Sequence, residues 1–351
     1  MEQKKDVLLL FLLKDFCKNN GIDEKYDIIK KKLEDEKLLQ KGIEELSIGE
    51  SQKMIEYFPL KKINKLSGNI DFYENIGAGS FGNVFKCFHQ LDKNDYAIKI
   101  VPVYDDVNKD KYIKEVEMMA SLDHPNIVRY YNSWIEKILP NNFDTSSLCL
   151  EEEDYSSEIV SDFNINEFLF IQMELCCGNL SDYLAKREEI NYLESNKIFI
   201  NIVKGLNYLH KMNIIHRDIK PSNIMFDKNG VAKIGDFGMS IKYDDEYCLY
   251  DKKLVKTENE YGTFNYLAPE ACEKKEYSFY SDIYSIGIIL FELLSLFTTA
   301  MEKQENINKL KKTGIILLKS EKEIKFIKLL INKNVFERPL TEEILKKILK
   351  K

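Results

Sequence analysis

One short stretch limits what this chain can fold into more than any other. Residues 214–225 read IIHRDIKPSNIM, with an apolar pair at each end and an imidazole, two cations, a carboxylate and an amide between them. The apolar pairs predict short buried strands that fix both ends of a loop and leave its polar side chains facing one way. A rigid loop of this kind is how proteins hold catalytic groups in place. The chemistry of such a loop depends on partners elsewhere in the chain.

Apolar and polar residues alternate in the chain from Ile70 to Val101, with glycines and an Asp-Lys-Asn turn between short runs. This pattern predicts a small antiparallel sheet, and further strands are expected near residues 127–135 and 168–173. A single helix is expected over residues 109–122. Its predicted inward residues are Ile113, Val116, Met119 and Ala120.

The remainder of the chain is mainly helical in pattern. Apolar residues recur at helical spacing, for example Ile198, Ile202, Val203 and Leu206 on one face. Strands first and helices afterwards predict an α+β fold with two lobes. Helices are expected at residues 180–186, 195–212, 281–297, 301–311, 321–331 and 341–349.

Charge and cysteine content exclude some functions. The formal net charge of −7 argues against a general nucleic-acid binder, which needs a dominant basic surface. The seven cysteines are scattered and form no CxxC pair, so neither a disulfide framework nor a zinc site is indicated. The apolar run at residues 7–13 is ended by Lys14 and Asp15 and lacks the cleavage site of a signal peptide. The run at residues 285–297 is too short to span a membrane. A soluble protein in the reducing cytoplasm is expected.

A glycine-rich segment, GAGSFGNV at residues 77–84, lies within the predicted sheet. Glycines allow backbone N–H groups to approach phosphate oxygens closely. The segment follows a strand and returns to a strand, which favours a flap over a nucleotide rather than a dinucleotide-binding fold. The alternative interpretation is an ordinary turn between strands.

Lys99 lies inside an apolar strand, Ala-Ile-Lys-Ile. A buried ammonium group needs an anion, and Glu115 on the next helix is the expected partner. Together they are candidates to hold the α- and β-phosphates of a nucleotide. The alternatives are a purely structural ion pair or a surface lysine.

The polar loop and a downstream Asp-Phe-Gly sequence supply candidate catalytic groups. Asp218 is expected to orient the attacking hydroxyl and accept its proton, and Lys220 to screen charge on the transferred phosphoryl group. Asn223 and Asp236 carry the hard oxygen atoms that suit Mg²⁺. His216 is expected to be a packed spacer rather than a base.

The glycine loop, Lys99, Glu115, the HRDxKxxN pattern and Asp-Phe-Gly occur in the order typical of protein kinases. Residues 70–349 resemble the protein kinase catalytic domain, of the serine/threonine type. The resemblance implies ATP and Mg²⁺ as cofactors. It also implies that Asp282 braces the catalytic loop and that Arg338 is a buried partner of Glu270 at the end of the activation segment.

The resemblance further assigns the nucleotide site. Met173 would be the gatekeeper residue, and residues 174–176 the hinge that holds adenine. The implied nucleotide-binding residues are Ile76, Gly77, Ala78, Gly79, Ser80, Phe81, Gly82, Val84, Ala97, Lys99, Met173, Glu174 and Cys176.

The resemblance to the kinase domain and the residue pattern before it set the expected domain boundaries. We expect a helical extension at residues 1–60, a linker at 61–69 and a kinase domain at 70–351. The small lobe would cover residues 70–173, with an acidic and largely disordered insert at 136–166, and the large lobe residues 177–351.

Segments at residues 124–136, 168–176 and 291–303, together with the position of the acidic insert, resemble the kinases of the alpha subunit of translation initiation factor 2. This resemblance implies that subunit as the protein substrate, a role in lowering translation under stress, and dimerisation through the small lobe. Thr299 and Glu302 become candidate docking residues; alternatively they form only a helix capping box. Thr257 is a candidate autophosphorylation site.

The first helices resemble the start of the haem-regulated member of that family. No histidine precedes His89, so haem is not among the expected cofactors. Two other interpretations stay open. One is a kinase for another protein substrate, and the other is a scaffold whose first helices and acidic insert bind partners. No nucleic acid or membrane is expected as a partner.

Overall fold

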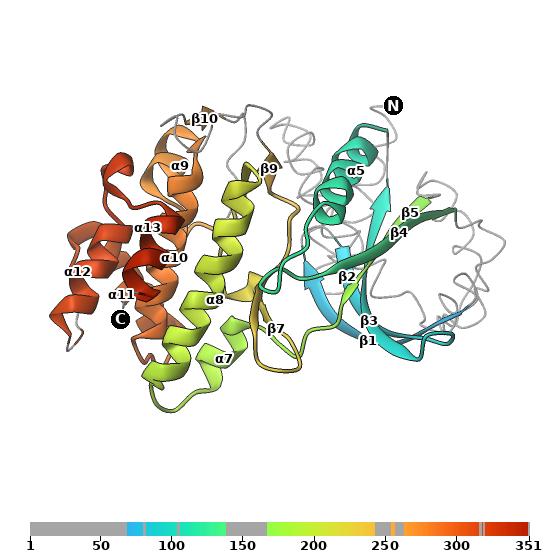
Figure 1. The fold of residues 1–351 in the computed structure, drawn as a ribbon, viewed down its shortest axis with the longest axis horizontal. Helices are drawn as coiled ribbons and strands as arrows, with labels where there is room; N and C mark the ends of the chain where they lie inside the picture. The colour runs from blue at the N-terminus through green and yellow to red at the C-terminus, as the bar shows by residue number, and fades with distance from the viewer. Residues whose placement is uncertain are drawn as a thin grey trace, which may run out of the picture.

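The computed structural model describes residues 69–79, 82–103, 106–137, 167–242, 254–256, 263–315, 318 and 320–349. Figure 1 shows two lobes, one built on a sheet with a helix against it and the other built from helices. The predicted helical extension, nearly all of the linker and most of the acidic insert lie outside the described residues, as do Ser80, Phe81 and Thr257. No helix among the described residues is long and apolar enough to cross a lipid bilayer.

The small lobe holds a five-stranded antiparallel sheet in the order β1-β2-β3-β5-β4. A helix, α5, follows β3. The elements are β1 (Ile70–Gly79), β2 (Gly82–His89), β3 (Asn94–Val103), α5 (Asp106–Ala120), β4 (Tyr130–Lys137) and β5 (Glu167–Glu174).

The alternation of side chains along β3 decides where Lys99 points. Ile98 and Ile100 enter a core on one face of the sheet, where Trp134 stacks on Phe170. Val101 enters the core on the opposite face, which includes residues of α5. Because successive side chains of a strand face opposite sides, Lys99 shares the face of Val101 and points toward α5.

The large lobe is helical, with short strand pairs at its junction with the sheet (Figure 1). Its elements are α7 (Leu180–Lys186), α8 (Tyr192–Lys211), β6 (Ile214–Ile215), η4 (Pro221–Asn223), β7 (Ile224–Phe226), β8 (Ala232–Ile234), β9 (Ile241–Lys242), β10 (Val255–Lys256), α9 (Pro269–Lys274), β11 (Glu276–Tyr277), α10 (Phe279–Leu293), α11 (Ala300–Thr313), α12 (Glu321–Leu330), η5 (Val335–Glu337) and α13 (Thr341–Leu349).

Helix α10 is the centre of this lobe, and every one of its residues is buried. Its close contact with the end of α12 requires Gly287, because a Cβ atom there would lie 2.7 Å from a side-chain carbon of Ile331. A helix that is apolar on all sides is expected to be enclosed by other elements. Helix α10 is therefore a rigid support for the other segments of the chain that contact it.

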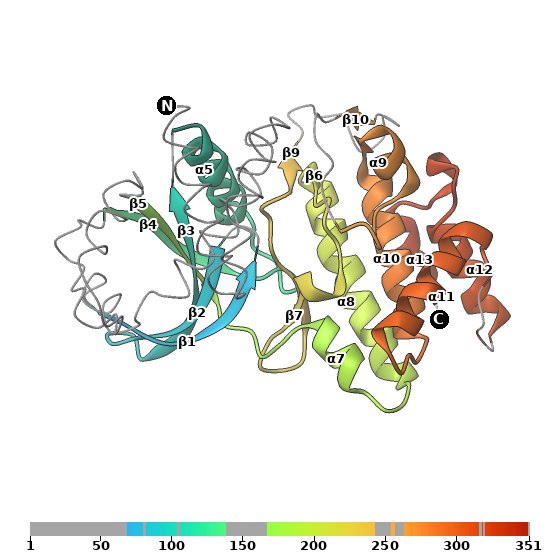
Figure 2. The same cartoon turned by 180° about the vertical axis from the view of Figure 1, so that it is seen from behind.

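The polar loop is held at both ends as the sequence predicts. Strand β6 pairs with β9, and β7 pairs with β8. Figure 2 shows β6 and β9 beside the end of α8. Ile214, Ile215 and Ile224 are fully buried, so the polar residues between them are fixed in position.

The predicted α+β fold of two lobes is confirmed, but some details of the prediction are wrong. Ile113 is 37% exposed and Ala120 is exposed, because α5 packs through Glu115 and Met119, one helical turn apart. Helix α10 ends at Leu293 rather than at 297, and the expected strand at residues 127–135 begins only at Tyr130.

Candidate active site

Lys99 lies between two carboxylates, from α5 and from the segment after β8. Its Nζ atom is 2.9 Å from Glu115 Oε1 and 3.6 Å from Asp236 Oδ1. Lys99 and Glu115 are both buried. The expected ion pair is therefore present and is completed by a second carboxylate.

The charges in this cluster stabilise one another. Burial alone would lower the pKa of Lys99, but Glu115 and Asp236 outweigh it and raise the pKa above its ordinary value. Burial would raise the pKa of Asp236, but Lys99, then His216 and Lys220, lower it below its ordinary value. Lys99 is therefore an ammonium and Asp236 a carboxylate at neutral pH.

The Asp218 carboxylate is buried and accepts hydrogen bonds at both oxygens. Oδ1 accepts from the backbone N–H of Thr263 at 3.0 Å and from its hydroxyl at 3.1 Å. Oδ2 lies 2.8 Å from Lys220 Nζ and accepts from Asn223 Nδ2 at 3.0 Å. Lys220 also donates to the Thr263 hydroxyl at 2.9 Å. The structure thus brings together three predicted site residues and adds Thr263.

The loop that carries Asp218 is attached to α10 through Asp282. The two carboxylate oxygens of Asp282 each accept a backbone N–H at 3.0 Å, from His216 and Arg217 respectively. His210 Nε2 lies 3.0 Å from the same carboxylate. Arg217 has φ 66°, a left-handed conformation that few L-residues adopt and that persists only when the surroundings enforce it. Asp282 is the brace that the sequence predicts.

His216 has a packing role, as expected. It is fully buried, its Nε2 lies 3.1 Å from the carbonyl oxygen of Gly235, and its ring lies 5.3 Å from that of Phe237. Phe237 is buried and follows Asp236, which has φ 60°. These contacts fix the backbone that aims Asp236 at Lys99.

The described residues of the glycine segment, 77–79 and 82–84, lie at the paired ends of β1 and β2. The strands remain paired to their ends, where Gly79 is opposite Gly82. In the sheet register Val84 lies between Gly77 and Lys99. Ile76 is 43% exposed and so is not part of the core, although it belongs to the alternating pattern.

The segment between the lobes begins where β5 ends. Met173 pairs with Ala97 in the ladder, and the Glu174 carboxylate lies 2.8 Å from Lys233 Nζ. Burial, followed by the nearby charge of Glu174, raises the pKa of the Cys176 thiol to about 12. Lys233 was not among the predicted residues; its position inside a short apolar strand was the available signal.

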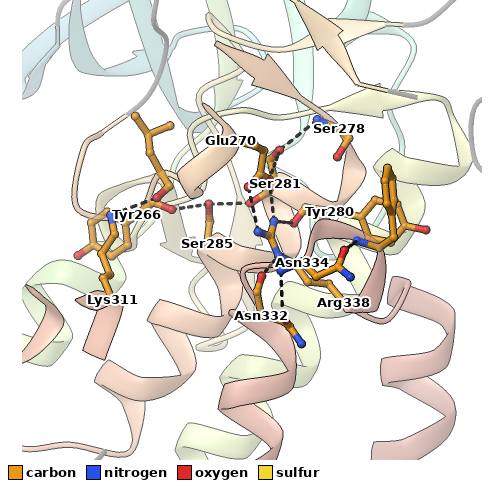
Figure 3. A network of polar contacts seen from close by, with 12 residues as sticks. Tyr266, Glu270, Ser278, Tyr280, Ser281, Ser285, Lys311, Asn332, Asn334 and Arg338 are labelled. Carbon is orange, nitrogen blue, oxygen red and sulfur yellow. Dashed lines mark hydrogen bonds and ion pairs between the residues drawn. The ribbon is translucent and has the colours of Figure 1, made fainter. Parts of the chain in front are cut away.

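A second buried ion pair lies below the site, as the sequence predicts. Arg338 contacts both oxygens of Glu270, at 2.7 and 2.9 Å, and donates to the carbonyl oxygen of Tyr280 at 2.9 Å. Figure 3 shows that Ser281 joins this pair, and its hydroxyl donates to Glu270 at 3.1 Å. The bidentate geometry and the burial of Arg338 and Glu270 make this a structural anchor.

The two candidate docking residues lie at the start of α11. Thr299 is the N-cap, and its hydroxyl accepts from the backbone N–H of Glu302 at 3.1 Å. The Glu302 carboxylate accepts from Thr298, from its N–H at 2.7 Å and its hydroxyl at 2.8 Å. The Glu302 carboxylate of the expected capping box therefore bonds to Thr298, the residue before the cap.

Comparison with known proteins agrees with this architecture. The profile of the protein kinase domain matches residues 70–349. The chain therefore belongs to the protein kinase family, and the prediction of a protein kinase is confirmed.

Curated relatives show which protein kinases this chain resembles. The interferon-induced, double-stranded RNA-activated protein kinase of Mus musculus is 33% identical over 79% of this chain and 50% of its own length. Proteins named eIF-2-alpha kinase GCN2 are 32% identical in Arabidopsis thaliana (77% of this chain) and 26% identical in Schizosaccharomyces pombe (85% of this chain), over 24% of their own length in each case. The chain spans half or less of these relatives. The resemblance to eIF-2-alpha kinases is confirmed at this level of identity.

Proposed function

We propose that this chain is a serine/threonine kinase that transfers the γ-phosphate of ATP to a serine of the alpha subunit of translation initiation factor 2, and thereby lowers translation under stress. The chemistry rests on one observation above others, the Asp218 carboxylate held between Thr263, Lys220 and Asn223. The choice of substrate rests on the relatives named eIF-2-alpha kinase.

On the acceptor side, Asp218 orients the serine hydroxyl and takes its proton as the oxygen bonds to the γ-phosphorus. The bond from that phosphorus to the β-phosphate oxygen breaks, and ADP leaves. Lys220 stabilises the negative charge on the phosphoryl oxygens, since it lies beside Asp218. Thr263 and Asn223 prevent Asp218 from rotating out of position.

On the nucleotide side, Lys99 binds the α- and β-phosphates and Glu115 orients it. Ile76, Gly77, Ala78, Gly79, Ser80, Phe81 and Gly82 cover the phosphates, and Val84, Ala97, Met173, Glu174 and Cys176 surround the adenine and ribose. The register of the sheet supports part of this assignment, because it places Val84 beside Lys99 and Ala97 beside Met173 on neighbouring strands.

Asn223 and Asp236 would hold Mg²⁺. The Asn223 amide nitrogen donates to Asp218, which leaves its oxygen as the atom to face a cation. Asp236 stays ionised because its pKa is lowered. These residues fit a hard cation. When bound, the ion would neutralise charge on the phosphates and align them for transfer.

The remaining assignments come from the family resemblance. Thr299 and Glu302 dock the protein substrate in addition to capping α11. Phosphate added at Thr257 pairs with Arg217 and orders the activation segment. Two copies of the chain associate through their small lobes.

A phosphorylation assay tests the proposal. The purified chain is incubated with radiolabelled ATP, Mg²⁺ and either the alpha subunit or a generic basic protein. Labelling of one serine in the alpha subunit, at a much higher kcat/KM than for the basic protein, is the expected result. Equal labelling of both proteins would favour a kinase for another substrate, and lack of ATP turnover would favour a scaffold.

The docking role needs a variant that keeps the helix cap. Aspartate is a good N-cap, so Thr299→Asp should retain α11 and yet weaken phosphorylation of the alpha subunit. Ser320→Asp, the same exchange of one capping residue for another at the start of α12, is the matched control and should leave phosphorylation of the alpha subunit unchanged. Equal effects of Thr299→Asp on the alpha subunit and on the basic protein would refute docking.

A further inference from the structure

Helix α11 is joined to the segment at residues 263–267 by a pair of side-chain amides. Gln304 Nε2 donates to Asn265 Oδ1 at 2.8 Å, and Asn265 Nδ2 donates to Gln304 Oε1 at 2.5 Å. Both residues are partly buried. Two opposed hydrogen bonds fix the distance and the relative orientation of the two amides, which a single flexible ion pair does not do.

Lys311, in the last turn of α11, makes a second connection to the same segment. Its Nζ donates to the carbonyl oxygens of Phe264, Asn265 and Leu267 at 2.9, 3.4 and 3.1 Å. Figure 3 shows Lys311 beside Tyr266, whose carbonyl oxygen accepts from Ser285 of α10 at 2.9 Å. All three N–H groups of the ammonium are thus directed at the backbone of one short segment.

A third connection passes through α10. Glu292 is 1% exposed, and its carboxylate lies 3.3 Å from Lys303 Nζ in the first turns of α11. Helix α10 in turn bonds to the 263–267 segment, because Ser285 donates to the Tyr266 carbonyl oxygen. Helix α11 is therefore fixed to the 263–267 segment from both of its ends.

The segment leads directly to the reacting groups. Thr263 is two residues from Asn265, and its N–H and hydroxyl donate to Asp218. One amide pair and two peptide units thus connect α11 to Thr263, which is itself held by Asp218. The Asn265–Gln304 pair therefore fixes the distance between α11, the proposed docking helix, and the Asp218 carboxylate.

We propose that Asn265 and Gln304 are positioning residues that hold α11 at a set distance from Asp218. The chain then selects protein substrates whose docked surface and acceptor serine are separated by the matching distance. The proposal rests on the docking role proposed above for the start of α11. It predicts that loss of the pair affects docked substrates and spares short peptides, which do not contact α11.

Steady-state kinetics of the purified chain with the alpha subunit and with a short peptide around its acceptor serine test this. Asn265→Leu and Gln304→Leu should each lower kcat/KM for the alpha subunit about tenfold, mainly through KM, and leave the peptide within about twofold. Asn306→Leu is the matched control, because its amide donates to the Glu302 carbonyl oxygen of its own helix. Equal losses on both substrates, or no loss, would overturn the proposal.

Two double variants separate positioning from general damage. Asn265→Leu with Gln304→Leu should be no worse than either single variant, since both remove the same pair. The exchanged pair, Asn265→Gln with Gln304→Asn, keeps the number of side-chain carbons and should recover most of the lost kcat/KM. Additive losses and no recovery would contradict the proposal.

Hydrogen exchange of the chain without substrate tests the connection independently of the substrate. Gln304→Leu should speed exchange both in α11 and in residues 263–267, whereas Asn306→Leu should affect α11 alone. Unchanged exchange at 263–267 would overturn the connection. If exchange changes as expected but wild-type protein does not prefer the alpha subunit to the peptide, the proposed substrate fails and the connection stands.

Discussion

Thr263 donates two hydrogen bonds to one oxygen of Asp218, from its backbone N–H at 3.0 Å and from its hydroxyl at 3.1 Å. The same hydroxyl accepts from Lys220 at 2.9 Å. A residue far along the chain therefore links the two side chains proposed to act on the acceptor hydroxyl and the phosphoryl group. Thr263 therefore joins the 263–267 segment to the carboxylate proposed as the base.

Substitution of Thr263 should slow the chemical step. Thr263→Val removes the hydroxyl at nearly constant volume, so kcat should fall about ten- to hundredfold while KM for ATP changes little. Thr263→Ser keeps the hydroxyl and should stay within a few-fold of wild type. Steady-state rates with a peptide substrate measure both variants, and equal activity of the valine and serine variants would contradict the role.

Lys99→Arg should reduce phosphate transfer by at least about a hundredfold, because a planar guanidinium cannot occupy the position between Glu115 and Asp236 in the same way. The matched control is Lys86→Arg, a lysine in an exposed pair 3.8 Å from Asp95 on the same sheet. Its rate should match wild type. Radiolabel transfer at saturating ATP measures both.

Breaking the buried pair should destabilise the large lobe. Glu270→Gln leaves Arg338 buried without its carboxylate and should lower the free energy of unfolding by about 3–5 kcal/mol. Glu321→Gln, in an exposed pair with Lys325, should change it by less than about 1 kcal/mol. Denaturant titration of the three proteins gives the comparison. A small effect at Glu270 would contradict the role of this pair as a structural anchor.

The stability of the chain should depend on pH through Glu292. Burial raises its pKa above the ordinary value of 4.5 in spite of Lys303. A carboxyl group with a raised folded pKa favours folding below pH 4.5, and this contribution is lost as the pH rises through the folded pKa. Wild type should therefore lose stability relative to Glu292→Gln as the pH rises from 4.5 to 8. A constant difference in Tm across that range would refute the assignment.

The adjacent cysteines between the lobes should differ in reactivity. Cys177 is exposed, whereas Cys176 is partly buried with a thiol pKa raised to about 12. Because the thiolate is the reactive form, iodoacetamide at pH 7.5 should modify Cys177 well before Cys176. Peptide mass spectrometry after short labelling times distinguishes the two, and preferential labelling of Cys176 would contradict its burial.

Much of the fold and of the site could be predicted because local chemistry specified it. Lys99 in an apolar strand required an anion, and Glu115 supplies it. The apolar pairs around the polar loop required buried strands, and β6 and β7 are those strands. Where burial or charge gives a residue only one acceptable environment, the sequence alone indicates the structure.

Other features depended on contacts between distant segments and were missed. Gly262-Thr263 is typical of serine/threonine kinases, but the contact of Thr263 with Asp218, 45 residues away, was not predicted. The Asn265–Gln304 pair joins polar residues that are common on surfaces. Ile113 was expected in the core because apolar residues are usually buried. It is exposed because α5 packs through the face that carries Glu115 and Met119. Such features are decided by tertiary packing, which periodicity does not record.

The loop that carries Asp218 is attached to the large lobe, whereas Lys99 and Glu115 belong to the small lobe. Asp282 fixes the loop to a helix whose residues are all buried, whereas Lys99 and Glu115 belong to a sheet and a helix of the other lobe. Relative motion of the lobes would therefore move Lys99, whereas the loop that carries the proposed base, Asp218, would stay attached to α10. Regulation that acts on the small lobe would therefore stop turnover without disturbing Asp218.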